Sequence, residues 1–299
     1  MAVYVNTNVS SLNGRRYLNN VQNQLTTTYQ RLSSGLRINS AKDDAAGLQI
    51  SSRLTTQING LNQGNRNSSD GIALAQTVEG GMDEITGMLQ KIRTLAVQAK
   101  NGTNTAEDRT ALSKEATQLA LEVNRIAEQT TFGGKKVLDG AGDDSLFEAG
   151  AGDWEGKMTL QVGANKGDTI DFAVNGMKLS QIASMAGIDD AGFADIFDDK
   201  ILIDDATKID GIIEGMDKLI AAVDGQRAGL GAIQNRLESS IRNQANVSAN
   251  QADARSRIRD ADFAEESANL SQQSIIQQAA TSMLMQANTR PQLGLSLLG

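Results

Sequence analysis

Hydrophobic residues in both flanks of the chain recur at alternating spacings of four and three residues. This spacing places them along one stripe of a helix, so it predicts helices that pack through a narrow seam. The clearest run covers residues 78–99 and stops before Asn101-Gly102, two residues that tolerate the left-handed conformation found after helices. A second run over residues 112–126 follows Thr105, which has an aspartate three residues later, as in a capping box. The flanks are therefore predicted to be mainly helical.

The longest run extends from Ile212 to Val247 and predicts a helix of about 37 residues, roughly 55 Å long at 1.5 Å per residue. Three positions of its seam are polar and are expected to fix the register of packing, namely Gln226, Ser240 and Gln244.

Weaker runs lie near the two ends of the chain, over residues 18–32 and 276–287. No side chain is ionised in residues 17–30 or 267–289. Surface helices of a soluble monomer carry charge on their outward face. These two segments are therefore expected to pair with each other, to be enclosed by neighbours, and to be disordered in the free chain.

The middle of the chain changes from helical spacing to strict alternation of apolar and polar residues. Residues 158–162 and 170–174 alternate in this way on either side of a turn, which predicts a β-hairpin. A second turn at Asn175-Gly176 leads to residues 177–179, which predicts a third strand of a meander. Residues 132–138 predict another short hairpin.

Composition excludes several classes of protein. The chain has no Cys and no His, which rules out disulfides, thiolate nucleophiles, imidazole bases and the usual zinc sites. The single proline, Pro291, leaves the long helices uninterrupted. Only 3% of the residues are aromatic, which is lean for one compact globule and favours an elongated architecture.

The acidity of the chain belongs to its middle. Residues 140–210 carry a net charge of -10 and the remainder a net charge of +2, which together make the overall -8. The chain lacks the basic surface that binds DNA or RNA. It also lacks an apolar run near 18 residues, so no membrane insertion is expected, and the first thirty residues do not have the pattern of a Sec signal peptide.

One segment resembles a known family. Residues 31–51, RLSSGLRINSAKDDAAGLQIS, resemble the N-terminal signature of bacterial flagellins, the subunits of the flagellar filament. Taken as a whole, the resemblance covers residues 1–175 and 205–299. Its further matches are residues 5–8, 88–93, 132–138, 160–165, 258–264 and 287–288.

The resemblance implies a mainly α fold: long antiparallel helices in an elongated, coiled-coil-like bundle with a small β-hairpin-rich central insert. Residues 1–44 and 256–299 would form an inner, channel-lining domain. Residues 45–139 and 205–255 would form a shell of long helices around it. Residues 140–204 would be a variable, acidic, surface-exposed insert.

The function implied by the resemblance is structural and not enzymatic. Flagellins are exported unfolded through the flagellum's own channel and fold as they polymerise into the extracellular filament used for swimming. The implied partners are other copies of the chain, the filament cap, hook-junction proteins, the flagellar export apparatus and an export chaperone on the C-terminal segment. No cofactor, metal or nucleic acid is expected.

Four groups of residues are predicted to carry this function. The polymerisation seam comprises Leu18, Val21, Leu25, Leu32, Ile276, Ala280, Met283 and Ala287, and the joint between the inner and outer shells comprises Leu36, Arg37, Lys42, Asp43 and Asp44. The export-chaperone segment comprises Phe263, Leu270, Ile275, Ile276, Met283 and Leu284. By resemblance to flagellins sensed by the vertebrate flagellin-specific Toll-like receptor, Gln90, Lys91, Leu95 and Glu115 would contact that receptor, with Lys91 standing where many recognised flagellins have Arg.

Three other interpretations were weighed. The first is a hook-filament junction adaptor, which shares flagellin-like termini. The second is an enzyme or cation site in the aspartate cluster of residues 189–199, whose spacing lacks the Gly and Glu of an EF-hand loop. The zinc protease that some flagellins carry in the middle is excluded because the chain has no His. The third is an adhesin that binds through Trp154, Phe147, Phe193 and Phe197, rings that we expect to be core instead.

Overall fold

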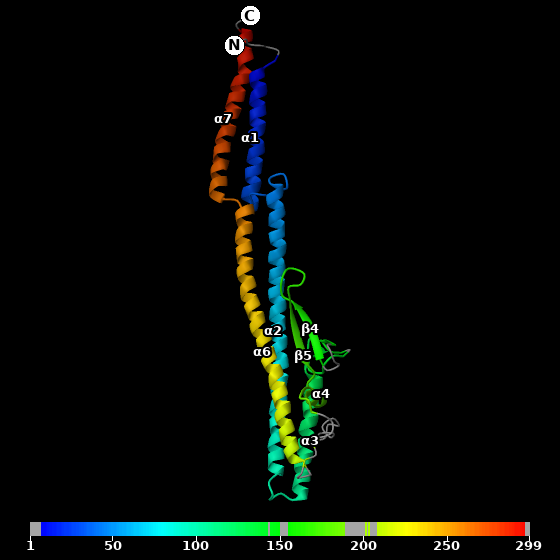
Figure 1. Ribbon diagram of the computed structural model, residues 1–299. Coiled ribbons are helices and arrows are strands. Elements are labelled where there is room, and N and C mark those ends of the chain that lie inside the picture. The colour runs from blue at the N-terminus through cyan, green and yellow to red at the C-terminus, as the bar shows by residue number, and fades with distance from the viewer. Residues whose placement is uncertain are drawn as a thin grey trace. The chain divides into compact units, whose positions relative to one another are not determined.

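The computed structural model describes residues 7–142, 144–149, 155–188, 201, 203 and 208–296, with side chains to residue 289. The chain forms two compact units, one of residues 1–58 with 249–299 and the other of residues 59–248. The predicted class, mainly α with β-hairpins in the middle, is confirmed (Figure 1). The five predicted domain segments are a different division of the chain and stay a prediction.

The first unit contains the paired terminal helices α1 (Val9–Ser34) and α7 (Phe263–Ser296), which run antiparallel beside each other (Figure 1). The predicted pairing of the two ends is therefore confirmed. Helix α1 begins where the Asn8 side chain accepts a hydrogen bond from the Ser11 amide at 3.1 Å. It ends at Gly35, whose φ of 71° is the left-handed conformation that glycine adopts without strain.

The second unit contains α3 (Ala106–Gln129) together with long parts of α2 (Ala45–Ala99) and α6 (Ile209–Arg259). The predicted capping box is confirmed, because the Thr105 amide donates to Asp108 at 2.9 Å and Thr105 Oγ1 accepts from the Asp108 amide at 3.2 Å. Every apolar position of the predicted α2 seam is fully buried: Val78, Met82, Ile85, Leu89, Ile92, Ala96 and Ala99.

The buried face of α3 differs slightly from the predicted one. Ala116 and Val123 are fully buried as predicted, but Leu112, Leu119 and Ile126 are only partly buried against the core. Their place in the centre is taken by small side chains, Ala120 and Ala127. The spacing of large residues thus located the helix correctly. The face that is buried is the one rich in alanine, because small side chains let the neighbouring elements pack closely.

Both predicted hairpins are confirmed. Strands β1 (Thr131–Phe132) and β2 (Lys135–Lys136) form the short one. Strands β4 (Glu155–Gln161) and β5 (Thr169–Asn175) form the longer one, with Met158 opposite Phe172. Phe172 is fully buried and stacks on Phe147, with ring centroids 5.8 Å apart, so the expected core role of Phe147 is also confirmed.

The predicted third strand at residues 177–179 is wrong. Helix α4 (Leu179–Met185) occupies that segment, and the third strand of the sheet is β3 (Glu148–Ala149), which pairs with β4. Leu179 and Ile182 are both fully buried on one face of the short helix. Two alternating apolar residues fit a strand, but the buried side chains three and four residues later belong to a helix.

The tip of the longer hairpin lies directly on α2. A Cβ atom at Gly64 would overlap the carbonyl oxygen of Val162, so only glycine permits this approach. The side-chain amide of Asn67 donates a hydrogen bond to the backbone carbonyl of Gln161 at 2.9 Å. The side-chain amide of the buried Gln244 of α6 donates to the backbone carbonyl of Val162. Backbone carbonyls of the hairpin are thus held by side chains of two helices.

None of the helices in the described ranges combines the length and the apolar character needed to cross a lipid bilayer.

Matched glycine substitutions in α2 will test the contact between the helix and the hairpin. We expect Gly64→Ala to destabilise the second unit by about 1–3 kcal/mol, because the added methyl group forces the hairpin away. Gly80→Ala meets no atom within 4 Å and should instead stabilise the helix by about 0.5–1 kcal/mol. Chemical unfolding followed by circular dichroism gives both values. Equal stability of the two variants would contradict the described packing.

Candidate functional site

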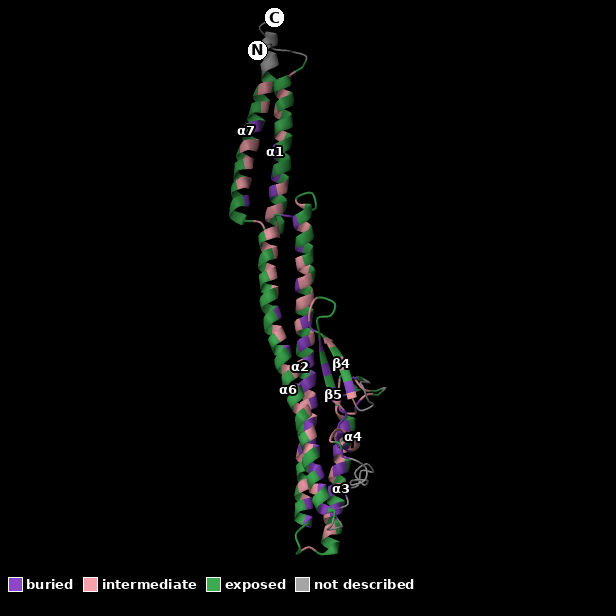
Figure 2. Cartoon of the chain, viewed as in Figure 1, coloured by how far each residue is buried: buried purple, intermediate pink, exposed green. Residues whose placement is uncertain are grey.

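The surface between α1 and α7 buries few apolar side chains. Among the described residues of these two helices, the buried hydrophobic ones are Val21, Leu25 and Ala280. Leu284 adds a contact, since a Cβ at Gly14 would lie 3.2 Å from its Cδ1 atom. Figure 2 shows the contrast with α2, where buried residues follow one another along a face of the second unit. The α1–α7 pair therefore has a thin core.

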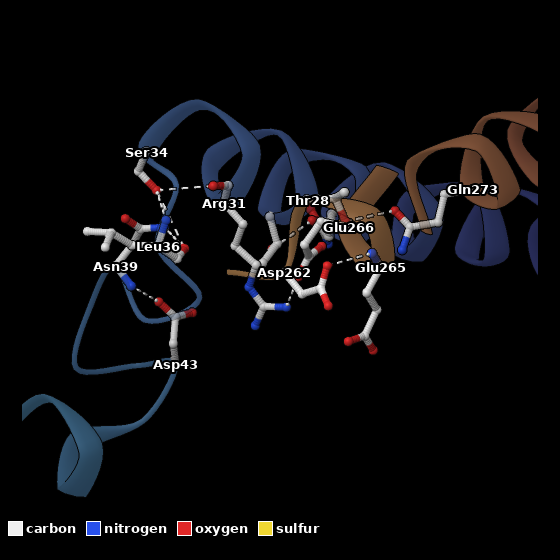
Figure 3. Close-up of polar contacts among 12 residues, drawn as sticks. Thr28, Arg31, Ser34, Leu36, Asn39, Asp43, Asp262, Glu265, Glu266 and Gln273 are labelled. Atoms are coloured by element: carbon white, nitrogen blue, oxygen red, sulfur yellow. Dashed lines mark hydrogen bonds and ion pairs between the residues drawn. The ribbon is translucent and has the colours of Figure 1, made fainter. Parts of the chain in front are cut away.

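Polar contacts supplement this thin core (Figure 3). Thr28 of α1 donates to the side-chain oxygen of Gln273 of α7 at 3.2 Å. Arg31 forms an ion pair with Glu266 at 2.9 Å, in which the side chains are 31% and 9% exposed. The two contacts lie about one helical turn apart on α1 and about two turns apart on α7, and they fix how far α1 is displaced along α7.

The pair is also closed at both ends. Near the chain termini, the side-chain amide of Asn8 donates a hydrogen bond to the backbone carbonyl of Ala287 at 2.8 Å. At the other end, the Ala261 amide just before α7 donates to the carbonyl of Gly35 just after α1 at 3.0 Å. Hydrogen bonds near both ends of the pair thus set the register of the two helices.

A groove of about 930 Å³ runs along the pair. Its apolar lining includes Tyr17 of α1 and Ile276 and Met283 of α7. The two helices also expose large hydrophobic side chains to solvent, each at least half exposed: Val9, Leu12, Tyr17, Tyr29, Phe263, Ile275, Met283 and Met285. This concentration of exposed large hydrophobic side chains on two helices is typical of an interaction site.

The predicted polymerisation seam is brought together only in part within one chain. Val21, Leu25 and Ala280 are buried, and Leu18, Leu32, Ile276 and Ala287 are half-buried. Met283 is 71% exposed, and Leu284 next to it takes the place against α1. Spacing alone locates the buried stripe of a helix only to within one residue. Successive side chains point about 100° apart around the helix axis, so either of two neighbours can lie nearer the partner helix.

Sequence reasoning missed the ion pair of Arg31 and Glu266. A signal was present, since these two residues directly border the uncharged segments 17–30 and 267–289. Arg31 is the first ionised side chain after residues 17–30, and Glu266 is the last one before residues 267–289. Antiparallel pairing of the two segments brings these two positions together. Thr28 and Gln273 had no comparable signal.

The predicted joint, residues 36–44, forms a turn packed on the segment before α7. The Arg37 amide donates to the Arg259 carbonyl at 2.7 Å, and its guanidinium donates to the Ile258 carbonyl at 2.5 Å. Leu36 pairs with Asp260 as an isolated antiparallel bridge. Two of the five predicted joint residues thus connect the turn to the segment that precedes α7.

The remaining joint residues act inside the turn or face solvent. Asp43 accepts from the amides of Ser40 at 2.9 Å and Asn39 at 3.1 Å, and these hydrogen bonds, that of Ser40 first, lower the pKa of its carboxyl below the usual value. Asp44 accepts from the Gly47 amide at 2.9 Å at the start of α2. Lys42 is exposed.

The predicted receptor-contact residues lie on two helices of the second unit. Gln90 and Lys91 of α2 and Glu115 of α3 are exposed, whereas Leu95 is half-buried against the core. In the export-chaperone segment, Phe263, Ile275 and Met283 are exposed. Its other members are half-buried: Leu270, Ile276 and Leu284.

Two of the alternative sites fall largely outside the described residues, namely the aspartate cluster of residues 189–199 and the rings of Trp154, Phe193 and Phe197. Within the described part of the chain, no three Asp or Glu side chains gather closely enough to hold a metal ion.

Comparisons with known proteins agree with the resemblance. Residues 5–143 match the bacterial flagellin N-terminal helical region, and residues 213–298 match the bacterial flagellin C-terminal helical region. Over the full length of both chains, this chain is 36% identical to flagellin D and 38% identical to flagellin A of Vibrio anguillarum. The chain belongs to the flagellin family. Flagellins are structural proteins.

A solved structure of a flagellar hook-associated protein from Vibrio parahaemolyticus shares the fold of this flagellin. Its TM-score is 0.56 at 15% identity, over 73% of this chain and 100% of that one. At this identity the likeness concerns the fold alone. The hook-junction alternative is therefore not better supported than the flagellin interpretation, which rests on relatives that match end to end.

Removal of Arg31 will test the polar contacts between the terminal helices. We expect Arg31→Ala to weaken the α1–α7 pairing by about 1–3 kcal/mol, because the Glu266 carboxylate stays buried without its partner. Replacing both residues, as Arg31→Met with Glu266→Leu, should restore most of the loss. Hydrogen exchange of the α1 amides in polymerised protein, together with the temperature at which the polymer dissociates, reports the change.

The control for this substitution is an exposed ion pair. Arg257 and Asp253 form one in which the side chains are 78% and 62% exposed. Arg257→Ala should therefore change the pairing by no more than about 0.5 kcal/mol. Equal effects of Arg31→Ala and Arg257→Ala would show that burial of Glu266 is unimportant.

Proposed function

We propose that this flagellin is a structural, non-enzymatic subunit of the bacterial flagellar filament and that it polymerises through the surface of α1 and α7. The observation that carries the proposal is the incompletely buried pair of terminal helices. Eight large hydrophobic side chains on this pair are at least half exposed, from Val9 to Met285. Exposed hydrophobic side chains in this number favour association with neighbours that cover them.

The size of the expected gain supports a polymer over a simple dimer. Complete burial of a large hydrophobic side chain contributes about 1.5–3 kcal/mol, so covering the exposed half of each contributes about 1 kcal/mol. The eight side chains together contribute about 6–12 kcal/mol, which is an upper estimate. Association costs about 4–15 kcal/mol in lost motion and ordering. One neighbour that covers part of this surface binds weakly, whereas several neighbours around each helix pair bind stably.

The charge pattern favours the same assembly. Residues 17–30 and 267–289 hold no ionised side chain, so copies can pack around them without removing ions from water. The polar atoms that remain are amides and hydroxyls, which find hydrogen-bond partners in many orientations. Folding of the two helices and association of the subunits then occur together.

The proposed organisation of the filament follows the predicted segments. Residues 1–44 and 256–299 line the channel, residues 45–139 and 205–255 form the shell around them, and residues 140–204 face outward. The joint of residues 36–44 connects the inner part of each subunit to the outer part. The filament lies outside the cell, and each subunit reaches it unfolded through the flagellar export apparatus.

The exposed residues of α7 also support an export chaperone as a partner. Phe263, Ile275 and Met283 present an apolar surface that would start polymerisation before export unless it is covered. The filament cap and the hook-junction proteins are the remaining proposed partners, at the two ends of the polymer.

Deletion of either terminal helix will test the polymerisation surface. We expect chains that lack residues 1–30 or residues 270–299 to form no filaments while the second unit stays folded. The point variant Ile275→Glu, which places a charge on the exposed face of α7, should reduce filament formation in the same direction. Electron microscopy counts filaments, and circular dichroism with thermal unfolding checks the fold. Filaments from either truncated chain would refute the proposal.

A second function, recognition by the vertebrate flagellin-specific Toll-like receptor, is favoured by the exposure of three of the four residues suggested for it. Gln90, Lys91 and Glu115 are open to a partner on α2 and α3. Leu95 is half-buried and supports the helices from within. Lys91 offers a compact ammonium where many recognised flagellins offer the planar, five-donor fork of Arg, so recognition is weaker at this position.

The receptor proposal is tested with purified monomer on reporter cells. We expect a response that Lys91→Arg increases severalfold, because Arg makes paired hydrogen bonds that Lys cannot make. Lys166→Arg, an exposed substitution of the same kind in the hairpin turn, should leave the response unchanged. Absence of any response up to micromolar monomer would exclude the function.

A further inference from the structure

The methionines that the structure describes differ widely in exposure. In the second unit, Met82, Met177 and Met216 are fully buried, and the rest are half-buried. Two methionines of the first unit are exposed, Met283 at 71% and Met285 at 61%. Both belong to α7, the helix proposed above as an assembly surface. The described thioethers that solvent reaches freely therefore lie on the surface that assembly would cover.

The two exposed methionines face different directions. Each residue advances a helix by about 100°, so residues two positions apart point about 200° from each other. Met283 and Met285 therefore lie on opposite sides of α7. Met283 lines the groove together with Tyr17, Ile276 and Ala280. Polar side chains, Asn13, Arg16 and Gln286 among them, line the same groove. The Met283 thioether is thus an apolar contribution to a mixed surface that assembly would cover.

We propose that Met283 and Met285 form an oxidation site that controls whether the subunit can assemble. The oxidant is a hydroperoxide, and the proposal rests on the proposed role of α1 and α7 in polymerisation. The sulfur lone pair attacks one peroxide oxygen, the O–O bond breaks, and a sulfur–oxygen bond forms. The thioether loses two electrons and becomes a sulfoxide, while the peroxide is reduced to water or, for an alkyl hydroperoxide, to the alcohol.

Oxidation at these positions changes the energetics of assembly and not of the subunit core. A sulfoxide is polar and hydrated in the free subunit, so covering it forfeits the hydrophobic gain of burying a thioether and raises the protein concentration needed for polymerisation by roughly tenfold. The buried methionines hold the core of the second unit and are shielded from the oxidant. Sulfoxide reductases reverse the change, and burial in the polymer prevents it. The site therefore responds to oxidant only before a subunit is incorporated.

The experiment treats full-length monomer with tert-butyl hydroperoxide and maps sulfoxides by peptide mass spectrometry. We expect Met283 and Met285 to oxidise at least about ten times faster than Met82, Met177 and Met216, in keeping with their exposure. Seeded polymerisation of the oxidised monomer should be lost and should return after treatment with both sulfoxide reductases. Polymerised protein should be protected at both positions.

The matched variant is Met283→Leu with Met285→Leu, which keeps an apolar side chain of similar size without sulfur. We expect it to polymerise equally before and after oxidant. If this variant assembles poorly from the start, recovery of the oxidised native chain by the reductases supports the proposal, and failure to recover overturns it. Polymerisation of oxidised native monomer at the untreated rate, or equal inhibition of the leucine variant, also overturns it.

These outcomes are distinguishable from failure of the proposed function. Should the chains truncated at residues 1–30 or 270–299 form filaments, the role of the terminal helices in polymerisation would be refuted. Should truncation abolish filaments while sulfoxides at Met283 and Met285 leave assembly unchanged, only the oxidation site would be refuted.

Discussion

The incomplete burial of α1 and α7 is the constraint on which the rest of this protein depends. The pair encloses Val21, Leu25 and Ala280 and leaves most of its other large hydrophobic side chains in contact with water. A single chain cannot cover them, because two helices have only one shared face. Hydrogen bonds and the Arg31–Glu266 ion pair fix how the two helices align, so that copies present the same surface. Alignment comes from within the chain, and in the proposed filament the missing burial comes from neighbours.

The second unit, in contrast, buries its hydrophobic side chains within one chain. Its helices carry the same four-and-three spacing, yet α2 buries its whole seam, because α3, α6 and the sheet supply covering side chains. Glycine at position 64 lets the hairpin backbone rest on α2, and Gln244 satisfies the carbonyl group that this contact removes from water. A closed core of this kind is stable by itself. The chain thus combines one self-sufficient unit with one that is completed by association.

This division explains how a chain without His or Cys can have a demanding function. Polymerisation requires no nucleophile, metal or cofactor, only a surface whose burial is favourable and a register that is repeatable. Uncharged amide and hydroxyl side chains suit the terminal helices, since they tolerate both water and protein neighbours. The same openness exposes the Met283 and Met285 sulfurs, which links the chemistry of the free subunit to the surface that assembly would cover.

The sequence alone determined the long helices, the two hairpins, the Thr105 cap and the membership of a family, because periodicity and local motifs are properties of consecutive residues. It also located the pairing of the ends through their shared lack of charge. Only the tertiary structure decided that Leu179–Met185 form α4, that alanines line α3, and that Leu284 packs beside Gly14 of α1. It alone showed the contact of Arg31 with Glu266. Each of these depends on residues far apart in the chain, whose distance is fixed by packing and not by spacing.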